Sequence, residues 1–311
     1  MIKPTYSIII PVFNEEEVLP SLFPRLEALV SRLDASCEVL LIDDGSRDRS
    51  PEIITKALAS FPWLRFIRFA RNFGHQAALS AGYDFAQGDA VVCMDADLQD
   101  PPEVVVEMAQ RWREGFQVIY GVRNARAGET LFKKFTAWSY YRTMRSLARI
   151  DMPVDAGDFR LLDRNAVDAL RSIRERNRYL RGLVAWIGFK QCSVKYDRAG
   201  RAAGETKYPL RKMLALAFDG ILSFSSVPLR TALILGFVVS GLSFITGIAA
   251  LVVKIGGWYT VDGWTSLAVL VCFIGGVHLT VMGLIGEYIS RIYDEVKARP
   301  LYIVAENRGG P

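Results

Sequence analysis

The stretch that decides the fold is AVVCMDAD, residues 90–97, in which five apolar residues lead directly into two aspartates one residue apart. An apolar run of this kind, between Gly88 and a following pair of prolines, is typical of a buried strand. Side chains two residues apart on a strand point to the same side, so Asp95 and Asp97 can offer oxygens to one hard cation. Mg²⁺ or Mn²⁺ held by one or two carboxylates usually keeps coordination sites for substrate phosphates. The stretch therefore favours an enzyme acting on a nucleoside diphosphate, although a solvated loop with two acids is the alternative.

Around this stretch, the sequence predicts an alternation of strands and helices. Such an order predicts an α/β fold with a mostly parallel, Rossmann-like sheet and helices on both faces. Ligands of such sheets bind beyond the carboxyl ends of the strands, which is where the unusual polar residues fall. The predicted strands are 6–12, 38–42, 64–69, 90–94, 117–120, 159–162 and 191–196, and the predicted helices are 15–33, 50–60, 76–86, 102–114, 132–150 and 165–173.

The C-terminal third differs in composition from the rest of the chain. Apolar residues make up 51% of the sequence, and the excess lies in two nearly uncharged runs, 231–253 and 265–285. Each run is long enough to cross a hydrocarbon core of about 30 Å, and both are too long and uniform for the alternative, a pair of buried core helices. Trp258, Tyr259 and Trp264 lie in the connection, as aromatic residues at a membrane interface do. The sequence therefore predicts a hairpin of two transmembrane helices.

Basic residues predict how this hairpin is oriented. Residues 209–224 show apolar spacing typical of an amphipathic helix, which we expect to lie in the membrane interface, an ordinary surface helix being the alternative. No signal peptide is visible in residues 1–10. Arginines and lysines lie before and after the hairpin, whereas the connection has only Lys254 nearby, so both ends are expected in the cytoplasm. The flanking basic residues are Arg211, Lys212, Arg230, Arg291, Lys297 and Arg299.

Four segments follow from these patterns: a cytosolic catalytic domain (1–207), an interfacial amphipathic helix (208–228), two transmembrane helices (229–286) and a cytosolic C-terminal tail (287–311). The net charge of +5 suits a protein lying on anionic lipid. No basic stripe with interleaved aromatic residues is present, so nucleic acid is not an expected partner. The four cysteines have neither metal-ligand nor redox spacing.

Further acids follow the first two predicted strands. PVFNE (11–15) ends the first strand, and DDGS (43–46) ends the second. Carboxylates at these positions can accept hydrogen bonds from a uracil ring and from ribose hydroxyls. A turn with a helix cap explains DDGS equally well, because Asp, Gly and Ser favour turns. After the central acid pair, Gln99 can add a neutral oxygen to the cation or to a bound water.

Basic residues in two loops suit phosphate groups. Arg123 and Arg126 follow the strand predicted at 117–120, and two arginines at this spacing can clamp a phosphate, although two solvated charges are the alternative. Arg198, Arg201 and Lys207 lie in a glycine-containing loop directly before the predicted interfacial helix. Three cations there suit a lipid-borne phosphate, or simply attract anionic headgroups.

Two further residues stand out near these motifs. The sequence DAGDFR (155–160) is another acidic turn, with Asp158 near its end. His75 is a lone histidine, which we interpret as a residue at the start of a helix and not as a base or a ligand.

Taken together, PVFNE (11–15), DDGS (43–46), DADLQD (95–100) and GDFR (157–160) resemble the inverting GT-A glycosyltransferases of family 2. The sequences GETKY (204–208) and IGEYI (285–289), with RPLY (299–302), narrow the resemblance to the polyprenyl-phosphate glycosyltransferases. Within these, the chain looks like dolichol-phosphate mannose synthase and, more closely, the bacterial bactoprenol glucosyltransferases with two C-terminal spans. The resemblance covers nearly the whole chain. The Gln-x-x-Arg-Trp motif of processive polysaccharide synthases is absent, which disfavours a polymer product.

The resemblance implies transfer of one sugar from a nucleotide diphosphate to a polyprenyl phosphate, at the cytoplasmic face of a bacterial plasma membrane. UDP-glucose and undecaprenyl phosphate are the preferred substrates, with mannose and N-acetylhexosamine donors as alternatives. A homo-oligomer is also implied. By analogy, the site comprises Pro11, Glu15, Asp43, Asp44 and Asp95 for the nucleotide sugar, Asp95, Asp97 and Gln99 for Mg²⁺ or Mn²⁺, Arg123, Arg126, Arg198, Arg201 and Lys207 for phosphates, and the catalytic Asp158 near the acceptor.

The reaction with a phosphate acceptor does not require a strong general base. A phosphate monoester has a second pKa of about 6, so the nucleophile is already anionic near neutral pH. We therefore expect Asp158 to orient the acceptor and to support the oxocarbenium-like centre. Two other functions remain open from the residues: a nucleotidyl- or phosphotransferase using the same cation, and an inactive scaffold that binds a nucleotide sugar.

Overall fold

The computed structural model describes residues 3–124, 156–176, 178–197, 227–256 and 263–309. These residues fall into two compact units, one formed by the chain before residue 221 together with the residues from Arg299 onward, and the other by residues between 221 and 298. The helices predicted at 132–150 and 209–224 lie outside the described residues. So do four of the predicted phosphate-binding residues, Arg126, Arg198, Arg201 and Lys207.

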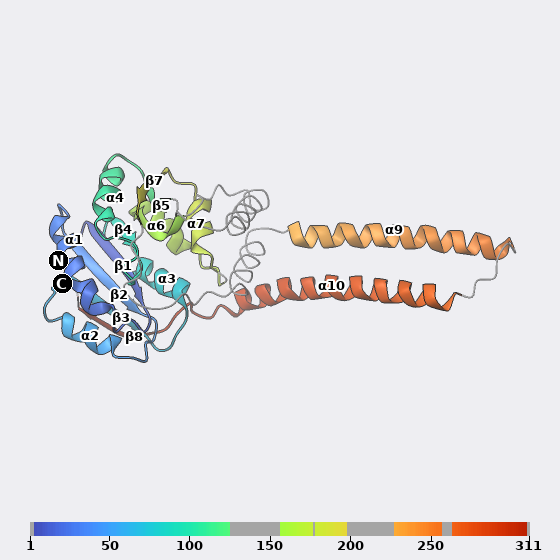
Figure 1. The fold of residues 1–311 in the computed structure, drawn as a ribbon, viewed down its shortest axis with the longest axis horizontal. Coiled ribbons are helices and arrows are strands. Elements are labelled where there is room, and N and C mark those ends of the chain that lie inside the picture. Colours follow the sequence, from blue (N-terminus) through green and yellow to red (C-terminus); the bar gives the residue numbers. More distant parts are fainter. Residues whose placement is uncertain (1–2, 125–155, 177, 198–226, 257–262, 310–311) are drawn as a thin grey trace. The chain divides into compact units, whose positions relative to one another are not determined.

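The first unit is built on a mixed sheet, which in the described residues has eight strands in the order β7-β5-β6-β4-β1-β2-β3-β8 (Figure 1). The central strands β4, β1, β2 and β3 are parallel, so their carboxyl ends meet at one edge. β6 and β8 are antiparallel to their neighbours. The strands are β1 (Tyr6–Val12), β2 (Cys37–Asp43), β3 (Leu64–Phe69), β4 (Ala90–Cys93), β5 (Val118–Arg123), β6 (Ala156–Asp163), β7 (Gln191–Tyr196) and β8 (Val304–Gly309).

Helices cover both faces of this sheet. Side chains of α1, α2 and α4 share one buried apolar cluster with alternate residues of β1, such as Ile8 and Ile10. On the other face α3 packs closely on β1, because a Cβ at Gly82 would lie only 2.1 Å from Cγ2 of Ile9. The helices of this unit are α1 (Leu19–Arg32), α2 (Ser50–Ala57), α3 (His75–Phe85), α4 (Val104–Arg113), α6 (Arg164–Ser172) and α7 (Leu180–Trp186).

The predicted α/β fold is confirmed, with a few shifted boundaries. α1 begins at Leu19 and not at residue 15, because the preceding residues form a turn in which the Glu15 carbonyl accepts the N–H groups of Val18 and Leu19. β6 is longer than predicted at both ends. Two elements were not predicted, the short helix α7 and the C-terminal strand β8.

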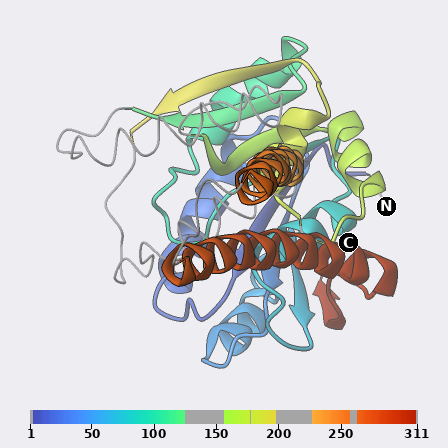
Figure 2. The ribbon, with the colours of Figure 1, turned by 90° about the vertical axis from the view of Figure 1, so that its right-hand side faces the viewer.

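The second unit contains two long helices, α9 (Val227–Ile255) and α10 (Trp264–Lys297), which run in opposite directions (Figure 1). In Figure 2, α9 points toward the viewer and α10 lies obliquely to it. Their apolar side chains are largely uncovered, with Phe237 71% and Leu279 73% exposed. Among the described residues, one segment, Phe273–Lys297, is long and apolar enough to cross a membrane. The second span predicted at 231–253 stays a prediction.

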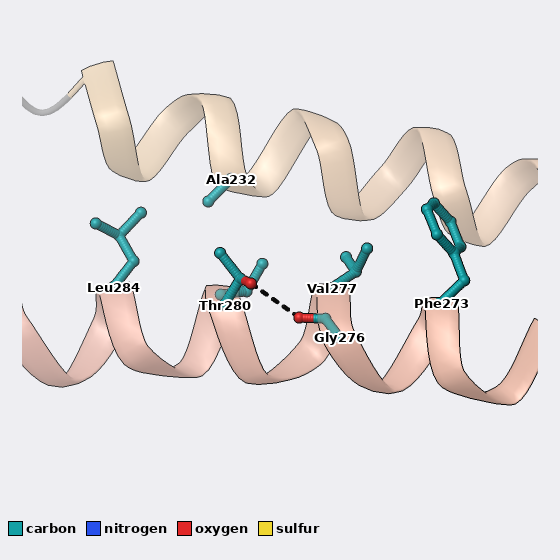
Figure 3. A pocket seen from close by; sticks show the side chains of 7 residues that line it. Ala232, Phe273, Gly276, Val277, Thr280 and Leu284 are labelled. Atoms are coloured by element: carbon teal, nitrogen blue, oxygen red, sulfur yellow. Dashed lines mark hydrogen bonds between the residues drawn. The ribbon is translucent and has the colours of Figure 1, made fainter.

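A cavity of about 410 Å³ lies between these two helices (Figure 3). The hydroxyl of Thr280 turns back to its own helix and donates to the Gly276 carbonyl at 2.8 Å. Among the described residues no charged side chain lines the cavity, so they offer no catalytic group there. Its lining residues are Ala232, Phe273, Gly276, Val277, Thr280, Val281 and Leu284.

Candidate active site

The two acids of the deciding stretch lie in the loop directly after β4, at the carboxyl edge of the sheet. The Asp97 carboxylate accepts the backbone N–H of Gln99 at 3.1 Å, which closes a tight turn. Leu98, between them, has a φ of 56°, a left-handed conformation that is rare for a residue with a branched side chain. Strain of this kind persists where the surroundings over-determine the backbone, as they do in many active sites.

Negative charge accumulates around this loop. Burial, together with the carboxylates of Asp158, Asp100 and Asp97, raises the pKa of Asp95 to about 6, although the charge of His75 opposes this shift. Carboxylates that share one site in this manner favour either a proton or a bound cation.

The same loop offers a neutral oxygen to a cation. The side-chain oxygen of Gln99 is buried and has no hydrogen-bond partner among the described residues. Within the described part of the chain, no group of three or more His, Cys, Asp or Glu side chains is arranged to hold a metal ion. The protein thus offers only part of a ligand set, with oxygens from Asp95, Asp97 and Gln99. Mg²⁺ or Mn²⁺ bound to such a site would take its other ligands from phosphate oxygens and water.

Asp158, on β6, has the opposite environment. Its carboxylate accepts hydrogen bonds from Arg160 at 2.8 Å and from both Nε and Nη2 of Arg181, at 3.1 and 2.8 Å. Burial alone would raise the pKa of Asp158, but the hydrogen bond from His75 and the charges of Arg181 and Arg160 hold it well below its usual range. Asp158 is therefore a fixed anion near neutral pH and a poor proton acceptor.

His75 connects these two environments. It begins α3, as predicted, and its Nε2 lies 3.5 Å from Oδ2 of Asp158 and 3.8 Å from Oδ1 of Asp95. Asp44 fixes the backbone before it, because its two carboxylate oxygens accept the N–H groups of Phe73 at 2.6 Å and Gly74 at 2.9 Å. The sequence analysis gave His75 no role at the site, since a single histidine carries no spacing that links it to distant acids.

The predicted nucleotide-binding motifs form one connected wall at the ends of β1 and β2. Val12 and Asp43 are direct neighbours in the sheet. Asn14 donates its N–H to the Ser46 hydroxyl at 2.9 Å, and its side-chain oxygen accepts the Arg47 N–H at 2.9 Å. The N–H of Glu15 donates to the hydroxyl of Ser50 at 2.9 Å. The two motifs therefore share one hydrogen-bonded turn, although they lie about thirty residues apart in the sequence.

The individual acids of this wall shape its backbone. The buried Asp43 accepts the Ser46 N–H at 3.0 Å and pairs with Arg68, whose Nε lies 3.2 Å from its Oδ2. Asp44 holds the backbone of Phe73 and Gly74, directly before α3. Pro11 and Glu15 are half-buried beside them. The carboxylate of Asp43 thus closes the turn, as the alternative predicted, but neither acid caps a helix, and their roles in nucleotide binding stay predictions.

Arg123, at the end of β5, is the one predicted phosphate-binding residue that the structure describes. Its Nε lies 3.4 Å from the Tyr196 hydroxyl, and its Nη2 lies 3.8 Å from Oδ1 of Asp100. The Tyr196 hydroxyl in turn donates to Asp100, and burial raises the pKa of Tyr196 to about 12. Arg123 is therefore oriented at the same edge as the acids after β4.

Arg160 and Arg181 are charged groups of the site that the sequence analysis missed. Arg160 is buried on β6, and Arg181 is half-exposed on α7. The basic run RNRYLR (176–181) was a visible signal, but nothing in its spacing connects it to Asp158.

The comparisons with known proteins agree with this geometry. The model of the family described as glycosyl transferase family 2 matches residues 7–171. The chain is 49% identical over 304 residues to YkcC of Bacillus subtilis, a glycosyltransferase described as uncharacterized, with 98% of this chain and 94% of the relative covered. It is 38% identical over 306 residues to the bactoprenol glucosyl transferase of Shigella phage SfII, with 98% and 99% covered.

One similar solved structure is glucosyl-3-phosphoglycerate synthase from Mycobacterium tuberculosis, in complex with Mn²⁺, uridine diphosphate and glucosyl-3-phosphoglycerate. It is 20% identical, with a TM-score of 0.48, and the match covers 71% of this chain and 80% of that chain.

Proposed function

The chain belongs to glycosyl transferase family 2, and from that premise we propose that it transfers one glucose from UDP-glucose to a polyprenyl phosphate such as undecaprenyl phosphate. The observation that carries the proposal is the edge of the sheet where acids suited to a cation and a diphosphate lie beside Asp158 and its arginines. Similarity to bactoprenol glucosyl transferases over nearly the full length supports this donor and acceptor.

The donor binds at the carboxyl ends of β1, β2 and β4. The wall formed by Pro11, Glu15 and the turn at 43–46 takes the nucleoside, since its backbone is fixed by the hydrogen bonds between the two motifs. Arg123 lies at the other side of the β4 acids and pairs with the diphosphate. Arg126, which follows closely in the sequence, has the same proposed role.

Asp95, Asp97 and Gln99 hold Mg²⁺ or Mn²⁺ in this proposal. The unpartnered oxygen of Gln99 and the raised pKa of Asp95 support it, because both features are relieved by a cation. When bound, such an ion acts as a Lewis acid toward the leaving diphosphate. Without that charge, bringing two phosphorylated substrates beside these acids would cost several kcal/mol at an effective dielectric of about 20.

The acceptor phosphate attacks the anomeric carbon from the face opposite the diphosphate. A bond forms between a phosphate oxygen and that carbon, the bond from carbon to the donor's phosphate oxygen breaks with its electron pair, and the configuration inverts. No proton has to be removed, because the acceptor is already anionic, with a second pKa of about 6. Asp158, kept ionised by Arg160 and Arg181, orients the acceptor side of the site and stabilises the positive charge that develops on the sugar.

The apolar helices bring this reaction to the membrane surface. α10 crosses the membrane, α9 is the second span, and residues 208–228 lie in the interface, with the catalytic domain and the C-terminus in the cytoplasm of a bacterium. Arg198, Arg201 and Lys207, directly before this interface segment, bind the phosphate of the lipid. The enzyme is a homo-oligomer in this proposal.

The decisive experiment incubates membranes containing the protein with polyprenyl phosphate and a panel of radiolabelled nucleotide sugars. We expect label from UDP-glucose in the lipid fraction, with release of UDP. Label from a mannose or N-acetylhexosamine donor would correct the sugar, and release of pyrophosphate would favour a nucleotidyltransferase. Binding of both substrates without any turnover would favour the scaffold and overturn the proposal.

A further inference from the structure

The chain returns to the catalytic sheet after the last apolar helix. α10 ends at Lys297, and Ala298 takes a left-handed conformation with a φ of 49°. From Ile303, whose carbonyl accepts the Ala70 N–H at 2.9 Å, the chain runs antiparallel to β3 as strand β8 (Figure 1). Six residues, 298–303, separate the end of α10 from the start of β8 in the sequence.

One set of contacts leads from β8 to the turn at residues 43–46. Glu306 lies opposite Arg68 in the sheet, and its carboxylate is 3.5 Å from Nη1 of Arg68. The same guanidinium pairs with Asp43 at 3.2 Å and donates to the Ser46 carbonyl at 3.5 Å. Asp43 is fully buried, which raises its pKa, and the hydrogen bonds from Ser46 and the charge of this arginine oppose that effect. Glu306 thus helps to hold the cation that neutralises the acid at the base of the turn.

A second, aromatic set of contacts leads to the start of α3. The ring of Tyr302 stacks on Phe69, with centroids 5.0 Å apart and planes at 9°, and its hydroxyl donates to Asp84 at 2.8 Å. Phe69 meets the edge of Phe73 at 5.8 Å. The N–H of Phe73 is in turn one of the two groups that Asp44 binds.

These two sets of contacts meet at the same turn. A Cβ at Gly45 would lie 2.5 Å from the backbone of Arg71, so the turn and the segment before α3 are packed directly together. A shift of β8 would therefore reach the turn from two sides, through Arg68 and through Phe73. Coupled contacts of this kind are worth more than the sum of single deletions.

We propose that residues 299–309, which we name the C-terminal strap, position the donor-binding turn at 43–46, so that donor affinity depends on the segment that follows the last apolar helix. Tyr302 and Glu306 are its positioning residues. Neither contacts the donor; they act through Phe69 and Arg68. The inference rests on the proposed function in one respect, which is that the nucleotide binds at this turn.

The test uses the full chain in lipid nanodiscs and measures UDP binding by calorimetry in the presence of Mn²⁺. The variants are Glu306→Gln, which removes the charge, and Tyr302→Ala, which removes the stacked ring. We expect each to raise the Kd for UDP by about tenfold. Tyr302→Phe keeps the ring and should stay within about threefold of the unaltered protein. Asn307→Ala changes an exposed side chain of the same strand and serves as the control, with an unchanged Kd.

Hydrogen exchange gives a second measurement that needs no ligand. In Glu306→Gln and Tyr302→Ala, amides of the turn at 43–46 and of residues 70–75 should exchange faster, while those of α4 should not change. Unchanged Kd and unchanged exchange in both variants would overturn the strap. If the unaltered protein does not bind UDP, the proposed function fails, and the exchange data alone still decide whether the strap holds the turn. If Tyr302→Ala does not fold, Glu306→Gln alone carries the decision, with Asn307→Ala as its control.

Discussion

Asp95 and Asp158 lie at the same edge of one sheet, 3.8 and 3.5 Å from Nε2 of His75, yet their surroundings shift their pKa values in opposite directions. Burial and three neighbouring carboxylates raise the pKa of Asp95 to about 6. Asp158 is more deeply buried, with 6% of its side chain exposed against 35% for Asp95, but the hydrogen bond from His75 and the charges of Arg181 and Arg160 keep its pKa well below the usual range. The first environment has too much negative charge until a cation arrives. The charge of Asp158 is neutralised by the arginines of the protein itself, so a bound cation would not stabilise it further.

This difference assigns the two acids to different partners. A carboxylate in an uncompensated acidic cluster is suited to a divalent ion and the diphosphate that accompanies it. A carboxylate that already accepts three hydrogen bonds from arginines can only act as a fixed charge or as a support for those arginines. Any result in which the two acids respond alike to metal or to pH would therefore contradict this assignment.

Removal of divalent ions should have the largest effect. We expect EDTA to abolish glucose transfer, and added Mn²⁺ or Mg²⁺ to restore it, because the acids around Asp95 repel the diphosphate when no cation is present. The measurement is transfer of radiolabelled glucose to polyprenyl phosphate, with and without chelator. Activity that survives thorough chelation would contradict the role given to Asp95 and Asp97.

Asp95→Asn should come next, with turnover reduced by about a thousandfold. The amide keeps the shape of the side chain but removes the charge that attracts the cation. Asp89→Asn is the matched control, because Asp89 lies at the other end of β4 and pairs with the exposed Lys3. We expect its turnover to stay within about twofold. Equal losses in the two variants would mean that Asp95 matters for the stability of the strand and not for the cation.

Asp158→Asn should have a smaller effect, about tenfold on turnover, and the loss should be constant from pH 6 to 9. The sign follows from the direction of the shift. A carboxyl group whose pKa in the folded protein is depressed is ionised throughout this range, so the ratio of the two proteins cannot change with pH there. A loss that grows with rising pH would indicate that Asp158 accepts a proton after all. Complete loss at every pH, with both substrates still bound, would equally contradict its supporting role.

Much of the fold could be predicted, because most strands are apolar runs bounded by turn residues. β1, β3 and β7 have the predicted bounds, 6–12, 64–69 and 191–196. β8 was missed because VAENRG is polar and lies at the edge of the sheet, where one face and one row of hydrogen-bonding groups meet solvent. It also pairs with β3, which lies more than two hundred residues earlier, and no local sequence pattern predicts such a long-range pairing.

The sequence predicted the positions of several site residues, but it did not predict which of them pair with one another. Asp95 and Asp97 could be placed at a sheet edge because they end a buried strand, and Arg123 for the same reason. The pairing of Asp158 with Arg181 could not, since the two residues come from different elements, and the direction of a pKa shift depends on neighbours in space. The roles of Arg126, Arg198, Arg201 and Lys207 stay predictions.

The last test concerns His75, because its Nε2 lies 3.5 Å from Asp158 and 3.8 Å from Asp95. We expect His75→Ala to lower kcat by about fivefold with KM for UDP-glucose within about twofold, since the two carboxylates lose the group that sets their separation but the nucleoside wall is untouched. His75→Gln can still donate one hydrogen bond to Asp158 and should recover kcat to within about twofold. The comparison predicts this rescue because Asp158 needs a donor and Asp95 needs a cation, which glutamine does not replace. If glutamine is no better than alanine, or if KM rises in place of the fall in kcat, His75 does not position the two acids and the contrast between them has another cause.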